Sequence, residues 1–285
     1  DAKTPSPIVD LEEETGSQNT IRYHDSQSVR VSSFVSIMQG CDMNCSFCIV
    51  PKTRGAERSR PMEHIIEEIH SIVDNGTREV TLLGQIVTSY GKREYPTHRG
   101  KTPFVQLLEK LHEIDGLHRI RFTSPHPLGF RKDLVGAFRD MPKLGEHAHL
   151  PVQSGSNRIL KAMNRPYSRE RYLKLIESLT TVSPNMHFST DIIVGFPGET
   201  EDDFRQTKSL FKAVGFDMAF IFKYSERTGT MAAEKSGKVS RATKDCRNQE
   251  LLRILESHSL ERNRSLVGTI QEVLVEGPAR KGGGM

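Results

Sequence analysis

Apolar and polar residues follow two different rhythms along the chain from Val31 onward. Short apolar runs of strand length alternate with longer stretches in which apolar residues recur every three or four positions, as in an amphipathic helix. Proline favours a helix start and glycine a helix end, so Pro61 and Gly76 bound the first of these helices. The pattern predicts strands at 32–38, 79–84, 118–123, 147–152, 187–196 and 217–225, and helices at 61–76, 103–116, 131–141, 168–182, 200–215 and 241–262.

This strand and helix order predicts the fold class. Strands that alternate with helices form a parallel sheet with right-handed crossovers. We therefore expect an α/β protein with a partial (β/α)6 TIM-like barrel. In such barrels the functional groups gather on the loops that follow the strand carboxyl ends.

The two ends of the chain have a different character. Residues 1–30 contain Pro5, Pro7, Gly16 and an acidic run without sustained periodicity, which indicates a linker or the remnant of a missing N-terminal domain. The segment "VGTIQEVLVEGP" alternates like a strand, so residues 263–285 are predicted to begin a second, small β domain that is cut short. The core domain is predicted to span residues 31–262.

Composition narrows the class of protein. Of 285 residues, 35% are hydrophobic and 27% charged, which is typical of a soluble globular protein. No apolar run approaches the roughly 18 residues of a membrane span, and the polar N-terminus does not resemble a secretory signal, so we expect a cytoplasmic, reducing location. A net charge of +4 is compatible with an anionic partner such as RNA.

The cysteines carry the strongest chemical signal. Cys41, Cys45 and Cys48 lie within eight residues after the first predicted strand, and Cys246 stands alone. An odd triplet in a reducing compartment does not suit disulfides. The C-x3-C-x2-C spacing lets each thiolate bind a different iron of a cubane cluster, which leaves one iron open. The alternatives are a zinc site completed by Cys246 or a histidine, and a redox pair of Cys45 and Cys48.

The cysteine spacing, with Phe47 before the last cysteine, resembles the radical S-adenosylmethionine (SAM) superfamily. Within it, five blocks over residues 31–276 resemble the tRNA methylthiotransferases: "VSIMQGCDMNCSFCIVPKTRGAERSRP", "EVTLLGQ", "IRFTSPHP", "HLPVQSGSNRILKAMNR" and "STDIIVGFPGETEDDF".

The forms "LLGQ" and "PVQSGS" resemble the MiaB-type branch, which acts on isopentenyl-adenosine beside the anticodon. Ile86 and Thr88 depart from it, since that branch usually has asparagines there. The other possibilities are the threonylcarbamoyl-adenosine branch, the ribosomal-protein branch, and a non-catalytic RNA-binding module with zinc at the cysteines.

The resemblance implies a [4Fe–4S] cluster on the three cysteines, SAM on the open iron, and a radical that abstracts hydrogen from C2 of the target adenine. It implies tRNA as substrate and an electron donor such as flavodoxin or ferredoxin. The blocks at the strand ends imply SAM contacts from Phe47, Gly84, Gln85, Gln153, Ser154, Ser156, Val194 and Gly195. Each block also has a structural interpretation: the glycines turn the chain, Ser156 caps a helix, and Glu199 favours a helix N-terminus.

Two further expectations concern RNA contacts and the histidines near the strand ends. The basic run Lys52, Arg54, Arg58 and Arg60 beside the cysteines is predicted to contact tRNA phosphates rather than to form only a solvated face. His147, His149 and Asp191 are predicted to be satisfied core or rim residues.

The resemblance also implies a second, auxiliary cluster bound by three cysteines of an N-terminal domain, and residues 263–285 resemble the start of an RNA-binding TRAM domain. After the triplet only Cys246 remains. The chain is therefore predicted to be a fragment that cleaves SAM but does not insert sulfur.

Overall fold

The computed structural model describes residues 30–277, so nearly all of the predicted N-terminal linker lies outside the described residues. Two parallel three-stranded sheets have the orders β1-β4-β5 and β6-β7-β8. A parallel bridge between Ile120 and Leu144 connects the first sheet to the chain that leads into the second. The strands are β1 (Ser32–Ser36), β4 (Glu79–Leu83), β5 (Arg119–Phe122), β6 (His147–His149), β7 (His187–Val194) and β8 (Met218–Lys223).

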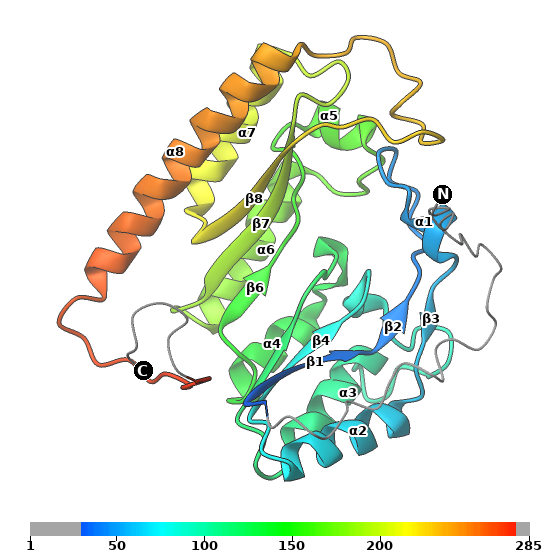
Figure 1. Cartoon of the computed structure of the whole chain (residues 1–285), viewed down its shortest axis with the longest axis vertical. Coiled ribbons are helices and arrows are strands. Elements are labelled where there is room, and N and C mark those ends of the chain that lie inside the picture. Colours follow the sequence, from blue (N-terminus) through cyan, green and yellow to red (C-terminus); the bar gives the residue numbers. More distant parts are fainter. Residues whose placement is uncertain (1–29, 278–285) are drawn as a thin grey trace, which may run out of the picture.

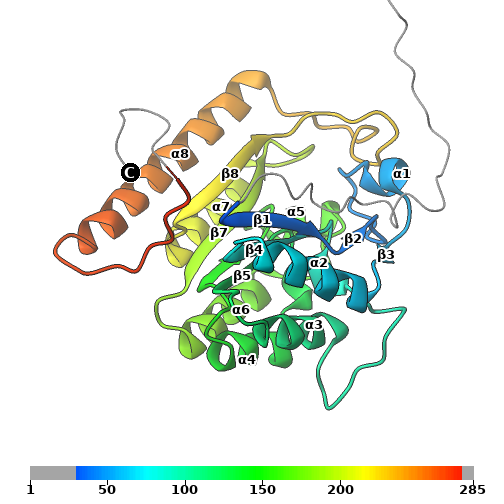
Figure 2. The ribbon, with the colours of Figure 1, turned by 60° about the horizontal axis from the view of Figure 1, so that its bottom comes forward.

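Six helices cover the outer faces of these sheets (Figures 1 and 2). They are α2 (Met62–Asp74), α3 (Pro103–His112), α4 (Lys132–Asp140), α6 (Arg169–Val182), α7 (Glu201–Val214) and α8 (Arg241–Ser265). The parallel α/β architecture is confirmed, and the six strands and six long helices predicted for residues 31–262 are present. The described strands form a partial barrel that does not close.

Side chains alternate between the two faces of each strand, as the pleat requires. In β7, Ile192 and Val194 are fully buried in the core beneath the helices. In β8, Ile221 packs against the same core, whereas Phe220 and Phe222 on the opposite face are about half exposed. The helices therefore cover one face of the partial barrel, and alternate residues are left facing away from them.

Several short elements were not predicted because they are too brief to show a hydrophobic period. Two of them form an antiparallel pair beside the first sheet, β2 (Met38–Gln39) and β3 (Arg58–Ser59). The helices α1 (Val50–Arg54) and α5 (Asn157–Ala162) and the 3-10 turns η1 (Val87–Ser89) and η2 (Pro127–Gly129) complete the set. Figure 1 shows α1 and α5 toward the same end of the partial barrel.

The C-terminal segment differs from its prediction. Helix α8 continues to Ser265, and residues 266–277 contain no strand. Val267 and Ile270 are 82% and 100% exposed. A strand needs a neighbouring strand to pair its backbone groups, and none of the described residues supplies one there. Within residues 30–277, no helix is both long and apolar enough to pass through a membrane.

Candidate functional site

The cysteines lie on a loop at the carboxyl-terminal edge of the first sheet, which we call the cysteine loop (residues 40–57). The β2–β3 pair closes its base, and the Cys41 amide donates to the Gly55 carbonyl at 3.0 Å. Gly40 begins the loop with a φ of +75°, and a Cβ there would lie 1.9 Å from the Ala56 carbonyl oxygen. Only glycine fits this position, so the sequence fixes the sharp turn that starts the loop.

The three thiols of the loop are free and partly shielded from water. Cys41 and Cys45 are buried, Cys48 is half-buried, and the Cys48 amide donates to the Cys45 carbonyl at 3.1 Å. Burial, with smaller contributions from Glu57 and the nearby Cys45 and Cys48, raises the pKa of Cys41 to about 11. Burial also raises the pKa of Cys48. Without a metal these two thiols are protonated at neutral pH. They would therefore have to release their protons when they bind iron.

The arrangement differs from that of a single-ion site. Among residues 30–277, no three His, Cys, Asp or Glu side chains gather around a common point as ligands of one ion do. A cubane does not require such convergence, because each thiolate binds a different iron. Cys246 is exposed on α8. Three thiols on one loop, with the fourth cysteine elsewhere, fit the donor set of a three-coordinated cluster.

The end of α5 holds the cysteine loop in place. Ser46 donates its amide to the Met163 carbonyl at 3.0 Å and its hydroxyl to the Ala162 carbonyl at 2.8 Å. The Asn164 side chain donates to the Asn44 carbonyl at 3.0 Å. These bonds attach a loop of the first sheet to the helix that follows β6, a strand of the second sheet. Phe47 adds an apolar anchor, since it packs against the small cluster of Ile159, Met163, Phe196, Tyr224 and Ala232.

Arg165, just beyond α5, is the one described side chain with a hydrogen bond to a cysteine sulfur. Its Nη1 donates to Cys45 Sγ at 3.4 Å, its Nε to the Tyr167 hydroxyl at 2.9 Å, and its Nη2 to the Pro151 carbonyl at 3.2 Å. Burial acts to lower the pKa of Arg165, but Tyr167 and Cys45 outweigh it, so the guanidinium stays charged. Sequence analysis did not identify this residue.

The predicted SAM contacts after β4 lie directly behind the strand end. A Cβ on Gly84 would lie 2.5 Å from the Met38 side chain, so the glycine lets β2 approach this turn closely. The Gln85 Oε1 atom is buried without a hydrogen-bond partner among the described residues. A buried acceptor without a donor is costly unless something satisfies it. Gln85 therefore fits a contact with the amino group of a ligand.

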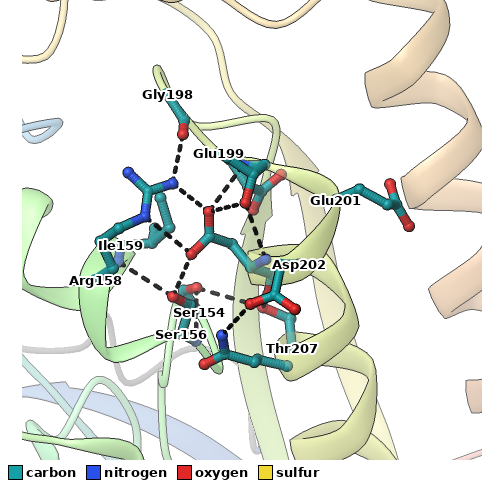
Figure 3. Close-up of polar contacts among 12 residues, drawn as sticks. Ser154, Ser156, Arg158, Ile159, Gly198, Glu199, Glu201, Asp202 and Thr207 are labelled. Atoms are coloured by element: carbon teal, nitrogen blue, oxygen red, sulfur yellow. Dashed lines mark hydrogen bonds and ion pairs between the residues drawn. The ribbon is translucent and has the colours of Figure 1, made fainter.

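Two of the three predicted contacts after β6, Ser154 and Ser156, are used by the protein itself (Figure 3). Gln153, with a φ of +68°, exchanges backbone hydrogen bonds with β7 through Asp191 and Ile193. Ser154 and Ser156 are fully buried. Their contact with SAM stays a prediction, because their hydroxyls already have protein partners.

These partners form a network that we call the serine–aspartate cluster, in which Arg158 and Thr200 are exposed and the other members are buried: Ser154, Ser156, Arg158, Thr200, Asp203 and Thr207. The Ser156 hydroxyl donates to Asp203 Oδ1 at 2.6 Å and caps α5 by accepting from the Ile159 amide. Burial alone would raise the pKa of Asp203, but hydrogen bonds from Arg158, Ser156 and Thr200 hold it far below its ordinary range. Thr200 and Asp203 also form a capping box that begins α7. The cap role predicted as an alternative for Ser156 is thus present.

The segment after β7 is tied to α8. The Gly195 amide and Arg247 Nη1 both donate to Glu199 Oε2, at 2.7 and 2.6 Å. Burial raises the pKa of Glu199, opposed by Gly195 and Arg247. Val194 was predicted to contact SAM, but its side chain points into the core, so only its backbone remains available there. Gly195 stays a candidate for backbone contact.

The predicted RNA-binding run divides in two. Lys52 and Arg54 are exposed on α1, and Arg58 is half-buried. The predicted RNA contact of Arg60 is corrected by the structure, because Arg60 is buried, pairs with Glu68 at 2.7 Å and donates to the Ser36 carbonyl. Its charge stabilises the base of the cysteine loop and is not available to phosphates.

The histidines of β6 have protein partners, which agrees with a structural interpretation. Ser189 Oγ lies 2.8 Å from His147 Nε2 and 2.9 Å from His149 Nδ1, and His149 lies 3.6 Å from Asp191. Burial lowers the pKa of His147 to about 4, so its ring is neutral at physiological pH.

The fold and the cysteine loop together define a parallel α/β partial-barrel protein with a thiol-rich loop at its functional edge. The chain belongs to the Radical SAM superfamily, whose sequence profile matches residues 35–211. The predicted superfamily is therefore confirmed.

Curated relatives refine this placement. A protein of Opitutus terrae is 56% identical over 96% of this chain and 62% of its own length. One of Methylacidiphilum infernorum is 54% identical over 97% of this chain and 59% of its own. Both are named tRNA-2-methylthio-N(6)-dimethylallyladenosine synthase. This chain thus spans about three fifths of the length of these relatives.

Solved structures resemble this fold at low sequence identity. The radical S-adenosylmethionine methyltransferase TsrM from Kitasatospora setae, with cobalamin and a [4Fe-4S] cluster bound, matches with a TM-score of 0.58 and 14% identity, over 70% of this chain and 36% of its own. The Escherichia coli coproporphyrinogen III oxidase HemN matches with a TM-score of 0.56 and 16% identity, over 80% and 53%. These similarities support the fold.

Proposed function

We propose that this chain is the radical SAM core of an enzyme that installs a 2-methylthio group on N6-dimethylallyladenosine in tRNA. The observation that carries the proposal is the cysteine loop: three partly shielded thiols at the edge of a parallel partial barrel, in a chain 56% identical to a relative of that name. The relatives' names favour this substrate over the threonylcarbamoyl-adenosine and ribosomal-protein branches.

The residues present fit a [4Fe–4S] cluster with SAM. Cys41, Cys45 and Cys48 would hold the cluster, and Gln85 offers its unpaired buried acceptor beside the same edge. When bound, the cluster and SAM supply the one-electron chemistry that activates a C–H bond, given an electron from a donor such as flavodoxin or ferredoxin. The chain itself orients the thiols through α5 and shields two of them from water. Our proposal assigns no residue of this chain as a ligand of the auxiliary cluster.

Anaerobic reconstitution tests the cluster. Iron and acid-labile sulfide are measured on the unaltered chain and on Cys41→Ala, Cys45→Ala and Cys48→Ala, followed by 5′-deoxyadenosine formation with SAM and dithionite. We expect each of the three variants to lose cluster and product. The matched control is Cys246→Ala, whose exposed thiol should not matter. Bound zinc without sulfide would instead support a non-catalytic metal-binding module.

The tRNA substrate is tested by binding. An anticodon stem-loop with or without the dimethylallyl group is titrated against the chain and a Lys52→Ala/Arg54→Ala double variant at several salt concentrations. Each lost phosphate contact should reduce the slope of log K against log salt by roughly 0.7. Arg139→Ala, on the exposed side of α4, is a control that removes a single positive charge away from α1. Equal slopes for all proteins would remove α1 from the RNA interface.

A further inference from the structure

Arg165 joins two loops that come from opposite halves of the fold. Cys45 lies on the loop after β2, and Pro151 follows β6, yet the same guanidinium donates to the Cys45 sulfur and the Pro151 carbonyl. Tyr167 holds the guanidinium from a third side, because its hydroxyl accepts from Arg165 Nε and donates to the Val152 carbonyl at 3.0 Å. The side chain is therefore fixed with one edge toward the thiol.

The surroundings of Arg165 lack an obvious countercharge. Within residues 30–277, Arg165 forms no ion pair with a carboxylate, and its partners are a hydroxyl, a carbonyl and a thiol. The two buried arginines of the described residues have acidic partners, since Arg60 pairs with Glu68 and Arg247 with Glu199. A shielded cation that faces a sulfur suits an anion at that sulfur.

A cluster on the cysteine loop would provide that anion. A [4Fe–4S] core in its 2+ state with three thiolates carries one net negative charge, and one-electron reduction adds a second. A fixed cation that donates to a ligating sulfur stabilises the state with more negative charge. Hydrogen bonds to cluster sulfurs are a known determinant of reduction potential.

We propose that Arg165 is a positioning residue that sets the reduction potential of the cluster by donating to the Cys45 sulfur, and so makes the cluster easier to reduce. This inference rests on the proposed function, because it requires the cluster to bind. It identifies a residue that neither touches SAM in our proposal nor belongs to the cysteine motif.

A purely structural role for Arg165 makes a different prediction. If the residue only bridges the loops, its loss would lower cluster content without moving the potential of the clusters that do form. Lysine would then fail as badly as methionine, because the planar fork that reaches both Cys45 and Pro151 would be gone in both variants. The reduction potential separates these two roles.

The experiment is a redox titration of the reconstituted chain, followed by the EPR signal of the reduced cluster. Arg165→Lys keeps the charge, Arg165→Gln keeps a neutral donor, and Arg165→Met removes both. We expect Arg165→Met to lower the ratio of reduced to oxidised cluster at least tenfold at a fixed potential, which corresponds to about 59 mV for one electron. In Arg165→Gln this ratio should fall nearly as far as in Arg165→Met, and in Arg165→Lys it should fall less. Arg171→Met removes the same charge from an exposed position on α6 and should leave the potential unchanged.

The outcomes are distinguishable. If the unaltered chain forms no cluster, the proposed function fails. If it does, and the Met and Gln variants form clusters with an unchanged potential, only the role of Arg165 is wrong. Loss of the cluster from all three variants, lysine included, would also overturn the charge argument in favour of a structural bridge.

Discussion

The two sides of the functional edge are built on different principles. The cysteine loop presents three thiols whose one side-chain hydrogen bond, within the described residues, comes from Arg165. The serine–aspartate cluster, in contrast, is a closed network in which Asp203 accepts from Ser156, Arg158 and Thr200. The first region keeps its reactive groups free for an added ligand, and the second uses its polar groups to hold the fold. A motif at a strand end can therefore serve the fold, whether or not it also contacts a ligand.

The largest loss of stability should come from breaking the buried ion pair that attaches α8 beside the serine–aspartate cluster. Arg247→Met removes the partner of Glu199, and the carboxylate would stay buried with the Gly195 amide as its main donor. Removing one member of a buried pair costs about 3–5 kcal/mol. Urea unfolding of the metal-free chain measures the loss.

Arg241→Met is the matched control for this prediction, since its side chain is 94% exposed at the start of the same helix. Its effect should stay below about 0.5 kcal/mol. If the two variants lose similar stability, the Arg247–Glu199 pair does not attach α8 as the structure indicates.

Asp203→Ala should cost somewhat less, about 2–3 kcal/mol, because it leaves the buried Ser156 hydroxyl without its acceptor while Arg158 can turn to water. It also removes the capping box of α7. Asp202→Ala, at an exposed position next to it, should change the unfolding free energy by at most about 1 kcal/mol. A loss as large for Asp202 would mean that charge near the helix start matters more than the network.

The pH dependence sharpens the same comparison. The pKa of Asp203 in the folded chain lies below its ordinary value of 3.8, so its contribution is fully present above pH 3.8 and is lost as the pH falls through the folded pKa. The unaltered chain should therefore lose stability on acidification below this value. Asp203→Asn should lose less over the same range, measured by urea midpoints at each pH. Parallel curves for the two proteins would contradict the low pKa.

Sequence analysis predicted the elements of this fold well, because each long helix and strand carries its own hydrophobic period. It also placed Cys41, Cys45 and Cys48 correctly on one loop, since they are neighbours in the chain. What it missed are contacts between distant residues. Arg165 and Cys45 are 120 positions apart, and Arg247 and Glu199 are 48 apart. No local pattern marks such pairs.

Two residue assignments depend on a feature that the motifs do not show, the direction of the side chain. The charge of Arg60 suggested RNA, but a short pairing of β2 and β3 turns it inward to Glu68. Val194 follows the strand alternation into the core, although its motif suggested a ligand contact. In both cases the direction of the side chain depends on strand register, which the motif alone does not fix.

The smallest effect on stability, and the clearest contrast, should come from the cysteine loop itself. Cys41→Ala removes a thiol that is protonated without metal and behaves as a small apolar group, so the metal-free chain should lose no more than about 1 kcal/mol. The loop is held by Gly40, Ser46 and Phe47, none of which the substitution touches. The same variant should lose its cluster completely.

Urea unfolding before reconstitution and iron content after it measure the two effects on one protein. A metal-free Cys41→Ala chain destabilised as much as Asp203→Ala would show that the thiol supports the fold, and the division between a region free for a ligand and a region that holds the structure would no longer stand.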